Sequence, residues 1–296
     1  MTVHRLANAL RNQNQKQLGR GREGLPYQNY RDIHTTFYDE MTRGTCQWIL
    51  KTPEYRAWCY PRGEGIPKRN EKTLFCYGVP GAGKTFVATA VIQDIRGLIQ
   101  DAGNRRIGVA FIYFSRQDQE TDHEAKRLLC NLLGQLIPTQ SRHTIDGDVT
   151  AQELFVNARQ VYNDSSHGEN GRGVALEEIR NVLALVTAWY ECIFVIVDAL
   201  EECCSQSQLQ MVLSTINSLQ DASDIDIRFF ATSTHANVPG SGFRDRKCLS
   251  LEIRAREEDV RRYLEDRMWQ LQDVIGENSE LQKLVKDVVV VGADQV

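Results

Sequence analysis

The chain has 296 residues, 42% of them hydrophobic and 25% charged, with a formal net charge of -4. Such a composition is typical of a soluble globular protein with one large domain or two ordinary ones. The sequence has no apolar run near the ~20 residues of a membrane-spanning helix, and its first residues lack the apolar core of a secretory signal. We therefore expect a cytoplasmic protein with no transmembrane segment.

The charge is unevenly distributed along the chain. Residues 1–72 contain 13 basic and 7 acidic side chains, a local +6, whereas the remainder contains 22 and 32, a local -10. A basic leader can attract nucleic acid or a membrane, but no aromatic stacking pattern accompanies the charge here. We therefore predict a polar, partly disordered leader over residues 1–43, an aromatic helical lead-in and connector over 44–72, and no specific nucleic-acid partner.

The eight cysteines and six histidines show no spacing typical of a metal site or a disulfide framework. No two cysteines form a C-x-x-C pair, and Cys76, Cys130 and Cys192 lie inside apolar stretches. A reduced thiol in such surroundings behaves as a small hydrophobic side chain. We therefore expect reduced cysteines.

Strand-like and helix-like segments alternate through most of the sequence. Thr52 followed by Pro53 is a typical N-cap and first-turn proline, so a short helix is predicted from Pro53 to Trp58. The predicted strands cover residues 73–77, 107–115, 193–198, 227–232 and 248–253. The predicted helices cover residues 84–99, 151–162 and 176–190, and another begins at the capping box Thr121-x-x-Glu124. The alternation predicts an α/β domain with a parallel sheet over residues 73–253, followed by a helical tail over 254–296.

The most informative motif is GVPGAGKT, from Gly78 to Thr85, which fits G-x-x-x-x-G-K-[ST]. A phosphate chain needs several converging backbone N–H groups, and glycines let the backbone curl closely enough to supply them. The predicted nucleotide-binding residues are Gly78, Pro80, Gly81, Ala82, Gly83, Lys84 and Thr85. Lys84 would reach the β- and γ-phosphates, and the Thr85 hydroxyl would ligate Mg²⁺. The alternative is a plain glycine-rich turn, which the position of the motif between a predicted strand and helix disfavours.

A second motif, IFVIVDALEEC from Ile193 to Cys203, describes a buried strand that ends in an acid. Ligands of open α/β sheets bind at this carboxyl edge of the strands. Asp198 would therefore hold Mg²⁺, directly or through water, and Glu201 or Glu202 would polarise the attacking water. The alternative is a core strand that ends in an ordinary polar turn.

A third segment, IRFFATSTH, follows another predicted strand with hydroxyl residues. Thr232, Ser233 and Thr234 are candidates for contacting the γ-phosphate, although Ser and Thr at a strand end are also ordinary turn formers. The predicted catalytic residues are Glu202, Glu201 and Thr234.

Taken in order, the segments GTCQW-IL-x-x-PE-Y-x-x-W, TLFCYGVPGAGKT, FVIVDALEEC and LEIRAREEDVRRYLEDRM resemble the fungal NACHT-type signal-transduction NTPases, or STAND proteins. The resemblance is greatest to the nephrocystin 3-like N-terminal domains, and it covers about residues 44–268. It implies a P-loop NTPase three-layer sandwich whose parallel five-stranded sheet has the order 5-1-4-3-2. It also implies a nucleotide-driven switch linked to self/non-self recognition and programmed cell death.

The resemblance assigns phosphate binding to Gly78, Gly83, Lys84 and Thr85, and magnesium to Asp198. It assigns the positioning of water to Glu202.

Two positions depart from the pattern of these relatives. Glu201 stands where they usually have aspartate, and Thr234 stands where they usually have arginine. The second change removes a cation, which Arg228, Arg254 or a partner protein could replace. Binding of ATP or GTP is therefore better supported than turnover.

Several functions remain open at this point. The first is a signalling switch with weak ATPase or GTPase activity; the others are a nucleotide-holding scaffold without hydrolysis and a P-loop small-molecule kinase. No N-K-x-D guanine motif and no LSGGQ-like stretch is present. The helical tail ends in VVVVGADQV and looks truncated, which would leave an apolar strip exposed. We expect this segment to bind a protein partner or a second copy of the chain.

Overall fold

The computed structural model describes residues 29–60, 71–101, 106–115, 124–137, 149–166, 174–203, 205–222, 225–235, 248–271 and 278–294. The chain forms two compact units. The sheet unit comprises Asn29–Ala125 and Tyr190–Val296, and the described residues of the helical unit lie within Lys126–Trp189. The domain boundaries drawn from the sequence, at residues 43, 72 and 253, stay predictions.

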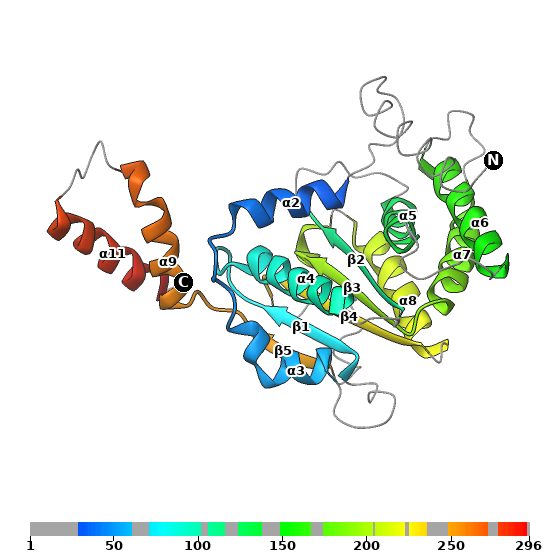
Figure 1. Cartoon of the computed structure of the whole chain (residues 1–296), viewed down its shortest axis with the longest axis horizontal. Coiled ribbons are helices and arrows are strands. Elements are labelled where there is room, and N and C mark those ends of the chain that lie inside the picture. The colour runs from blue at the N-terminus through cyan, green and yellow to red at the C-terminus, as the bar shows by residue number, and fades with distance from the viewer. Residues whose placement is uncertain are drawn as a thin grey trace, which may run out of the picture. The chain divides into compact units, whose positions relative to one another are not determined.

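The sheet unit is built on five parallel strands (Figure 1). The strands are β1 (Thr73–Tyr77), β2 (Ile107–Tyr113), β3 (Cys192–Asp198), β4 (Asp226–Ser233) and β5 (Leu249–Glu252). Their order across the sheet is β2-β3-β4-β1-β5. Read from the other edge, this is 5-1-4-3-2, so the predicted α/β fold and strand order are confirmed.

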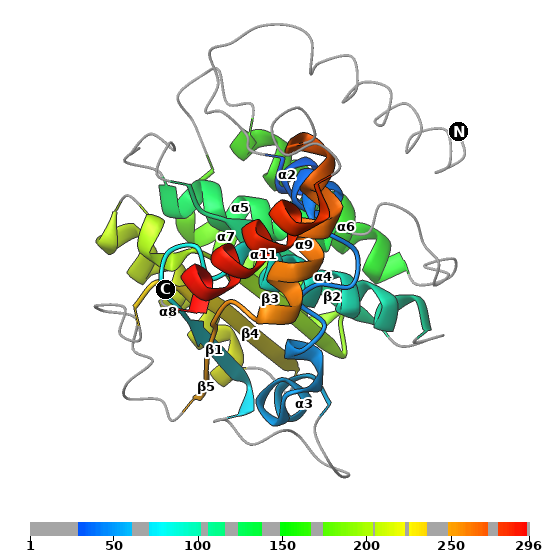
Figure 2. The same cartoon turned by 90° about the vertical axis from the view of Figure 1, so that its left-hand side faces the viewer.

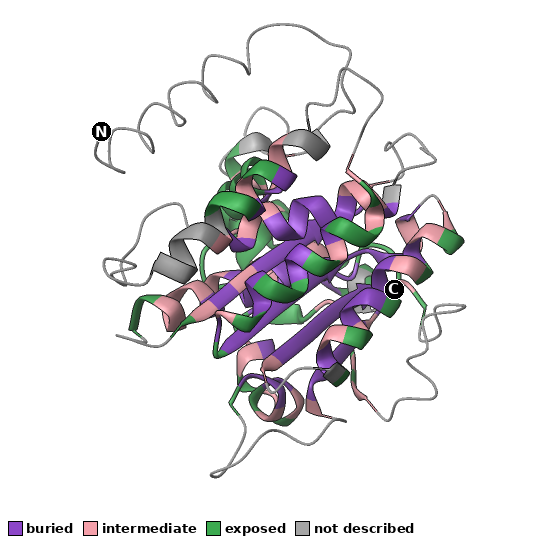
Figure 3. Cartoon of the chain, turned by 90° about the vertical axis from the view of Figure 1, so that its right-hand side faces the viewer, coloured by how far each residue is buried: buried purple, intermediate pink, exposed green. Residues whose placement is uncertain are grey.

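The central strands form the core because each contains a continuous apolar run. Every residue of β3 is buried, and β1 and β4 are buried at all but one position each. Figure 3 shows this buried band running through the sheet. A strand covered on both faces reads as a continuous apolar run, which is why these strands could be predicted from the sequence.

The helices of the sheet unit belong mainly to four segments of the chain. The segment before β1, called the lead-in from here on, contains α2 (Tyr30–Glu40), η1 (Ile49–Lys51) and α3 (Pro53–Cys59). Helix α4 (Lys84–Asp101) follows β1; η3 (Leu200–Glu202) and α8 (Gln206–Ala222) follow β3; α9 (Glu257–Arg267), η4 (Met268–Leu271) and α11 (Ser279–Asp294) follow β5. The predicted cap of α3 is confirmed, because the Thr52 side chain accepts a hydrogen bond from the Tyr55 N–H at 3.2 Å. Helix α4 packs on β2, β3 and β4.

The helical unit contains α6 (Val149–Ser166), α7 (Leu176–Ala188) and most of α5 (Glu124–Leu136). Within it, α6 packs against α7. Gly134 of α5 leaves room for an α6 ring, because a Cβ there would lie 2.3 Å from Cε2 of Tyr162. The Thr121 capping box lies outside the described residues, as does the leader up to residue 28.

Helix α2 was not predicted from the sequence; it lies within the leader that was expected to be partly disordered over residues 1–43. The Asn29 side chain caps the helix by accepting from the Arg31 N–H at 3.2 Å, and Tyr30 and His34 are buried. An asparagine before a polar eleven-residue run was the available signal. The helix packs on α4 and β2.

Helices α9 and α11 pack side by side in the sheet unit (Figure 2). Surface ion pairs join them, Arg261–Asp287 at 3.1 Å and Lys286–Glu265 at 3.4 Å. The outer face of α11 is apolar: Leu284 is 58% and Val288 62% exposed. Among the described residues, no helix has both the length and the apolarity that crossing a membrane requires.

Arg228 anchors the amino end of the sheet. It is buried near the start of β4, where its guanidinium bonds the Asp226 carboxylate and the Trp58 carbonyl oxygen. The guanidinium carbon also lies 5.6 Å from the centre of the Phe194 ring. Because ligands of such sheets bind at the opposite, carboxyl edge, Arg228 is not a source of charge for a γ-phosphate, and that alternative was wrong.

Candidate functional site

The loop from Gly78 to Thr85 connects β1 to α4 at the carboxyl edge of the sheet. Gly81 and Gly83 have φ values of +84° and +87°, which favour glycine strongly. A Cβ at Gly78 would lie 2.3 Å from the Ile253 carbonyl oxygen, so the start of the loop passes directly against the chain after β5. All three glycines are therefore required by the backbone path.

The loop is not covered by the described part of the chain. A Cβ at Gly81 or Gly83 would meet no atom of the described residues within 4 Å. The N–H groups of Lys84 and Thr85 stand in the first turn of α4, where no intrahelical acceptor is available to them. These N–H groups and the positive end of the helix dipole are suited to an anion such as a phosphate group.

Lys84 folds back over its own loop. Its Nζ donates to the carbonyl oxygens of Gly78, at 2.9 Å, and Val79, at 3.1 Å. Both acceptors are neutral, so an anionic group at the loop would be a stronger partner for the ammonium.

Asp198, the last residue of β3, is brought to the first turn of α4. Its Oδ2 accepts from the Thr85 hydroxyl at 2.7 Å, and its Oδ1 accepts from the Thr232 hydroxyl at 2.5 Å. Thr232 in turn accepts from the Ala199 N–H at 2.9 Å. The two predicted magnesium ligands, Thr85 and Asp198, are thus adjacent, whereas Thr232 stands behind the carboxylate and is fully buried.

Burial raises the pKa of Asp198 to about 6. The hydrogen bonds from Thr232 and Thr85 oppose this rise, the nearby Glu201 carboxylate adds to it, and Lys84 opposes it. The site therefore holds negative charge that its own residues only partly compensate, which favours a cation as partner.

The turn after β3 carries the two predicted catalytic glutamates. Ala199 has φ +58°, a left-handed conformation that is strained for a residue with a Cβ. Beyond it, Glu201 Oε1 accepts a hydrogen bond from the Thr234 hydroxyl, while Glu201 Oε2 is buried without a partner in the described part of the chain. Glu202 is partly exposed in the same turn, and its N–H donates to the Ala199 carbonyl at 2.9 Å. The structure therefore joins Glu201 and Thr234, the two positions that depart from the resembled pattern.

Arg254 lies at the carboxyl edge of the sheet, the same edge as the other site residues, but its side chain is exposed. It lies just beyond β5, next to Ile253, and pairs with Glu252 at 3.0 Å with 76% of its side chain exposed. Ser233, the other hydroxyl candidate, is fully buried at the end of β4 and accepts from the His235 N–H at 3.3 Å.

These residues fit a magnesium nucleotide. A hydroxyl and a carboxylate are the hard oxygen ligands that Mg²⁺ prefers, and this ion usually keeps several waters and takes few ligands from the protein. The partly compensated Asp198 carboxylate and the buried Glu201 oxygen without a partner in the described residues suit a cation as ligand. In the described residues, no cluster of three or more His, Cys, Asp or Glu side chains could hold a metal without further ligands.

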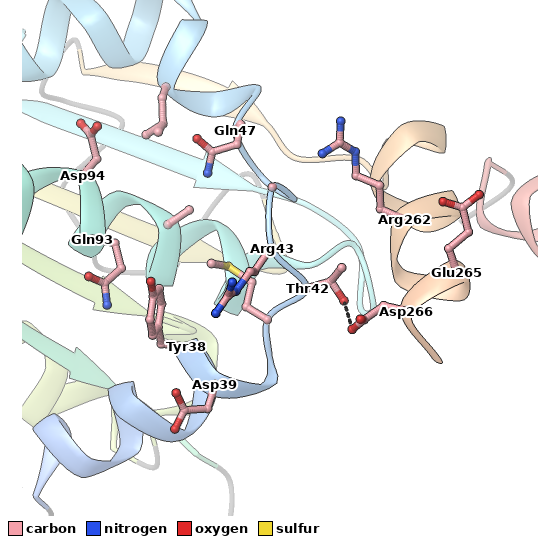
Figure 4. Close-up of a pocket in the computed structure, with 14 residues that line it drawn as sticks. Tyr38, Asp39, Thr42, Arg43, Gln47, Gln93, Asp94, Arg262, Glu265 and Asp266 are labelled. Atoms are coloured by element: carbon pink, nitrogen blue, oxygen red, sulfur yellow. Dashed lines mark hydrogen bonds between the residues drawn. The ribbon is translucent and has the colours of Figure 1, made fainter. Parts of the chain in front are cut away.

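A cavity of about 870 Å³ lies beside α4 (Figure 4). The residues that line it come from the lead-in, from α4 and from α9. Across it, the Thr42 hydroxyl donates to Asp266 at 3.1 Å, as Figure 4 shows. Gln93 of α4 forms part of its wall.

The GTCQW segment, Gly44 to Trp48, holds α9 in place. The Cys46 N–H donates to the Asp259 carboxylate at 2.9 Å, and Arg256 lies 4.7 Å above the Trp48 ring. Gly44 has φ +82°, and a Cβ there would lie 2.5 Å from the Arg262 side chain. The sequence indicated a motif here but gave no role for it; the structure assigns it to docking the helix that follows β5.

The parallel sheet, its strand order and the glycine loop between β1 and α4 define a P-loop NTPase-like fold. The sequence profile described as nephrocystin 3, N-terminal, matches residues 44–234. The chain belongs to this family. Among curated proteins, no sequence matches it.

Several solved structures are similar to this chain at low identity. The Aeropyrum pernix ORC1 protein, in complex with DNA, is 15% identical with a TM-score of 0.46, covering 76% of this chain and 48% of that one. The replication initiator DnaA, bound to AMPPCP and single-stranded DNA, is 14% identical with a TM-score of 0.40, covering 85% and 58%. PCH-2 of C. elegans is 10% identical with a TM-score of 0.39, covering 82% and 52%. This chain thus spans about half the length of these proteins, and the similarity concerns the fold alone.

Proposed function

We propose that this chain is the nucleoside-triphosphate-binding module of a NACHT-type (STAND) signalling protein and that it takes ATP or GTP together with Mg²⁺. The observation that carries the proposal is the 2.7 Å hydrogen bond between Thr85 and Asp198 beside the open glycine loop. It joins the two predicted magnesium ligands next to the predicted phosphate site. Family membership supports the same function.

Each residue of the site has a defined task in this proposal. Lys84 exchanges the Gly78 and Val79 carbonyls for phosphate oxygens, and the N–H groups of the loop bind the same phosphates. Thr85 and Asp198 hold Mg²⁺. Mg²⁺ held by these two residues would neutralise part of the charge of the phosphate groups.

The first test is equilibrium binding of ATP and GTP with Mg²⁺, combined with mass spectrometry of any nucleotide that copurifies. We expect Lys84→Ala to weaken binding about 100-fold, because charge-assisted bonds to phosphate contribute roughly 1.5–3 kcal/mol each. Lys51→Ala is the matched control: this lysine is exposed on η1, and its loss should leave affinity unchanged. Wild-type affinity in Lys84→Ala would contradict the phosphate site.

For hydrolysis we propose Glu201 as the residue that polarises water, with Thr234 orienting it. The hydrogen bond between them and the buried free Oε2 of Glu201 support this choice over Glu202. Hydrolysis should be slow, because Thr234 offers a neutral hydroxyl where an arginine could stabilise the charge of the transferring phosphoryl group, an effect worth ~10³-fold or more.

The second test measures phosphate release by the wild type, Glu201→Gln and Thr234→Arg. We expect a wild-type rate well below the roughly 1–100 s⁻¹ of kinases, a further loss in Glu201→Gln and a gain in Thr234→Arg. Binding with no phosphate release at all would instead favour a nucleotide-holding scaffold, and release only with an added acceptor would favour a kinase. Loss of release in Glu202→Gln but not in Glu201→Gln would reverse the assignment.

As a signalling module, the chain would act in fungal self/non-self recognition or cell death, in the cytoplasm. The resemblance to NACHT proteins supports this role. A protein partner, or a second copy of the chain, would bind the C-terminal helices, and the exposed Leu284 and Val288 of α11 support such a contact. Sedimentation of the wild type and of Leu284→Glu, with and without nucleotide, tests self-association; identical sedimentation would exclude it through this face.

A further inference from the structure

A chain of four hydrogen bonds, the middle two buried and the outer two partly buried, runs from the cavity wall to the phosphate-loop end of α4. Gln93 Nε2 lies 3.0 Å from His34 Nε2, His34 Nδ1 lies 2.8 Å from Tyr113 Oη, and Tyr113 Oη lies 3.1 Å from Thr89 Oγ1. Thr89 Oγ1 then donates to the Thr85 carbonyl oxygen at 2.8 Å. His34 and Thr89 are fully buried and Tyr113 is 3% exposed, so these three side chains depend on one another for hydrogen bonds, whereas Gln93 is partly exposed at the cavity wall.

Only one assignment of donors and acceptors satisfies all four of these hydrogen bonds. The Thr85 carbonyl can only accept, so the Thr89 hydroxyl donates to it and must accept from Tyr113. The Tyr113 proton is then used, so His34 donates from Nδ1 and accepts at Nε2 from the Gln93 amide. Burial and the charge of Arg96 lower the pKa of His34 to about 4, which agrees with a neutral ring.

Tyr113 connects the two halves of the predicted magnesium site. It is the last residue of β2 and is the register partner of Asp198 at the end of β3. The next residue, Phe114, donates its N–H to the Asp198 carbonyl at 3.2 Å. The Tyr113 backbone is therefore fixed to the strand that carries Asp198, while its hydroxyl reaches across to the helix that carries Thr85.

We propose that Tyr113, oriented by His34, is a positioning residue for the magnesium site: it holds the first turn of α4 so that the Thr85 hydroxyl faces Asp198. The proposal rests on the proposed function of this site. The same hydrogen bonds connect α2, which supplies His34, to the nucleotide site. A displacement of α2 would therefore weaken magnesium binding.

A purely structural role is the competing explanation. His34 packs among aromatic rings, 5.1 Å from Phe111 between ring centres, and buried polar groups usually find partners whatever their function. Tyr55 provides a matched control outside this series of hydrogen bonds. It is also fully buried, and its hydroxyl also bonds α4, donating to Asp94 Oδ2 at 2.6 Å. Asp94 lies nine residues beyond Thr85, so this bond should not affect the first turn.

The experiment compares Tyr113→Phe with Tyr55→Phe. Each removes one buried hydroxyl and keeps the ring. ATP affinity is titrated in Mg²⁺ and in EDTA, Mg²⁺ is titrated at fixed ATP, and thermal unfolding is recorded without nucleotide. We expect both variants to lose similar thermal stability, but only Tyr113→Phe to lose roughly tenfold in Mg²⁺ affinity, as groups that orient metal ligands commonly do. ATP affinity in EDTA should stay at the wild-type value.

Three further variants, at two positions, keep the inference testable if Tyr113→Phe fails to fold, and they test the donor and acceptor roles along the chain of hydrogen bonds. Thr89→Val breaks the same path in a near-isosteric way and should weaken Mg²⁺ in the same manner. His34→Asn keeps a side-chain N–H donor toward Tyr113 and should retain most Mg²⁺ affinity, whereas His34→Leu should not. Equal Mg²⁺ affinity in Tyr113→Phe and Tyr55→Phe, with wild-type ATP binding intact, would overturn this inference alone. A wild type that binds no nucleotide in either buffer would overturn the proposed function and this inference with it.

Discussion

The two ends of the parallel sheet both bury charged side chains, but they treat them differently. At the amino end, Arg228 is surrounded by the Asp226 carboxylate, the Trp58 carbonyl and the Phe194 ring. At the carboxyl end, Asp198 receives only two hydroxyl bonds, and Glu201 keeps a buried oxygen without a partner in the described residues. Asp226 Oδ1 is also buried without a partner in the described residues, so the difference lies in the cation: Arg228 bonds its carboxylate directly, whereas Asp198 is bonded by neutral hydroxyls, and a buried charge without a counter-charge is costly unless a ligand supplies one.

The largest effect is expected at the amino end. Arg228→Met removes the cation but leaves Asp226 and the Trp58 carbonyl buried without it, which should lower the free energy of unfolding by about 3–5 kcal/mol. Urea unfolding followed by tryptophan fluorescence measures this loss. Nucleotide affinity of the folded variant should stay at the wild-type value; a selective loss of affinity would mean that Arg228 acts at the site after all.

The difference between the two ends also explains what the sequence could predict. The strands and the glycine loop were predictable because continuous apolar runs and G-x-x-x-x-G-K-T are local signals. The suggestion that Arg228 could reach a γ-phosphate was avoidable. Arg228 stands at the beginning of its predicted strand, whereas ligands of such sheets bind at the carboxyl ends of the strands. The contact between Thr234 and Glu201 was not predictable, because it depends on the relative position of two turns that are 33 residues apart.

Helix α2 and its hydrogen-bond chain show a second limit of the sequence. The run YRDIHTTFYDE has few apolar residues, and its two buried side chains, Tyr30 and His34, are both types that often occur at surfaces. Their burial comes from packing on α4 and β2, which no local pattern encodes. A buried histidine could be identified only once its partners Tyr113 and Gln93 were in place.

Two buried groups should make opposite contributions to stability in acid. The pKa of His34 is lowered from 6.5 to about 4, so protonation of the unfolded chain destabilises the fold as the pH falls from 6.5 to 4, by about 3 kcal/mol. The pKa of Asp198 is raised from 3.8 to about 6, so the folded chain gains a proton first and is stabilised over nearly the same window, by about 3 kcal/mol. In the wild type these two contributions should largely cancel.

Variants separate the two contributions. Urea midpoints between pH 7 and 4, in EDTA, should fall more steeply with acid in Asp198→Asn than in the wild type, because only the histidine contribution remains. In His34→Asn the urea midpoints should rise relative to those of the wild type as the pH falls, because only the aspartate contribution remains. Parallel curves for all three proteins would show that neither group titrates as its burial predicts.

A smaller gain in stability is expected from the site itself. Asp198→Asn removes a buried charge whose raised pKa marks a cost, so at pH 7.5 without ligand the fold should gain about 2 kcal/mol. The hydroxyls of Thr85 and Thr232 can each donate or accept and can therefore still bond the amide. The same variant should lose Mg²⁺-dependent nucleotide binding. Asp39→Asn, an exposed position on α2, serves as the control and should change neither quantity.

The smallest effect is expected at Arg254, which provides the exposed counterpart of Arg228. Its ion pair with Glu252 leaves 76% of the arginine side chain and 45% of the glutamate side chain in solvent. Such pairs contribute about 0.5 kcal/mol, because water already satisfies both charges and salt screens them. Arg254→Met should therefore shift the urea midpoint barely, and the shift should vanish in high salt, while Arg228→Met stays strongly destabilised. Arg254→Met also tests whether Arg254 supplies charge to a γ-phosphate. A fall in phosphate release in this variant, at unchanged stability, would assign the arginine to the nucleotide. An unchanged rate would leave Thr234 and Glu201 as the groups that set the slow turnover.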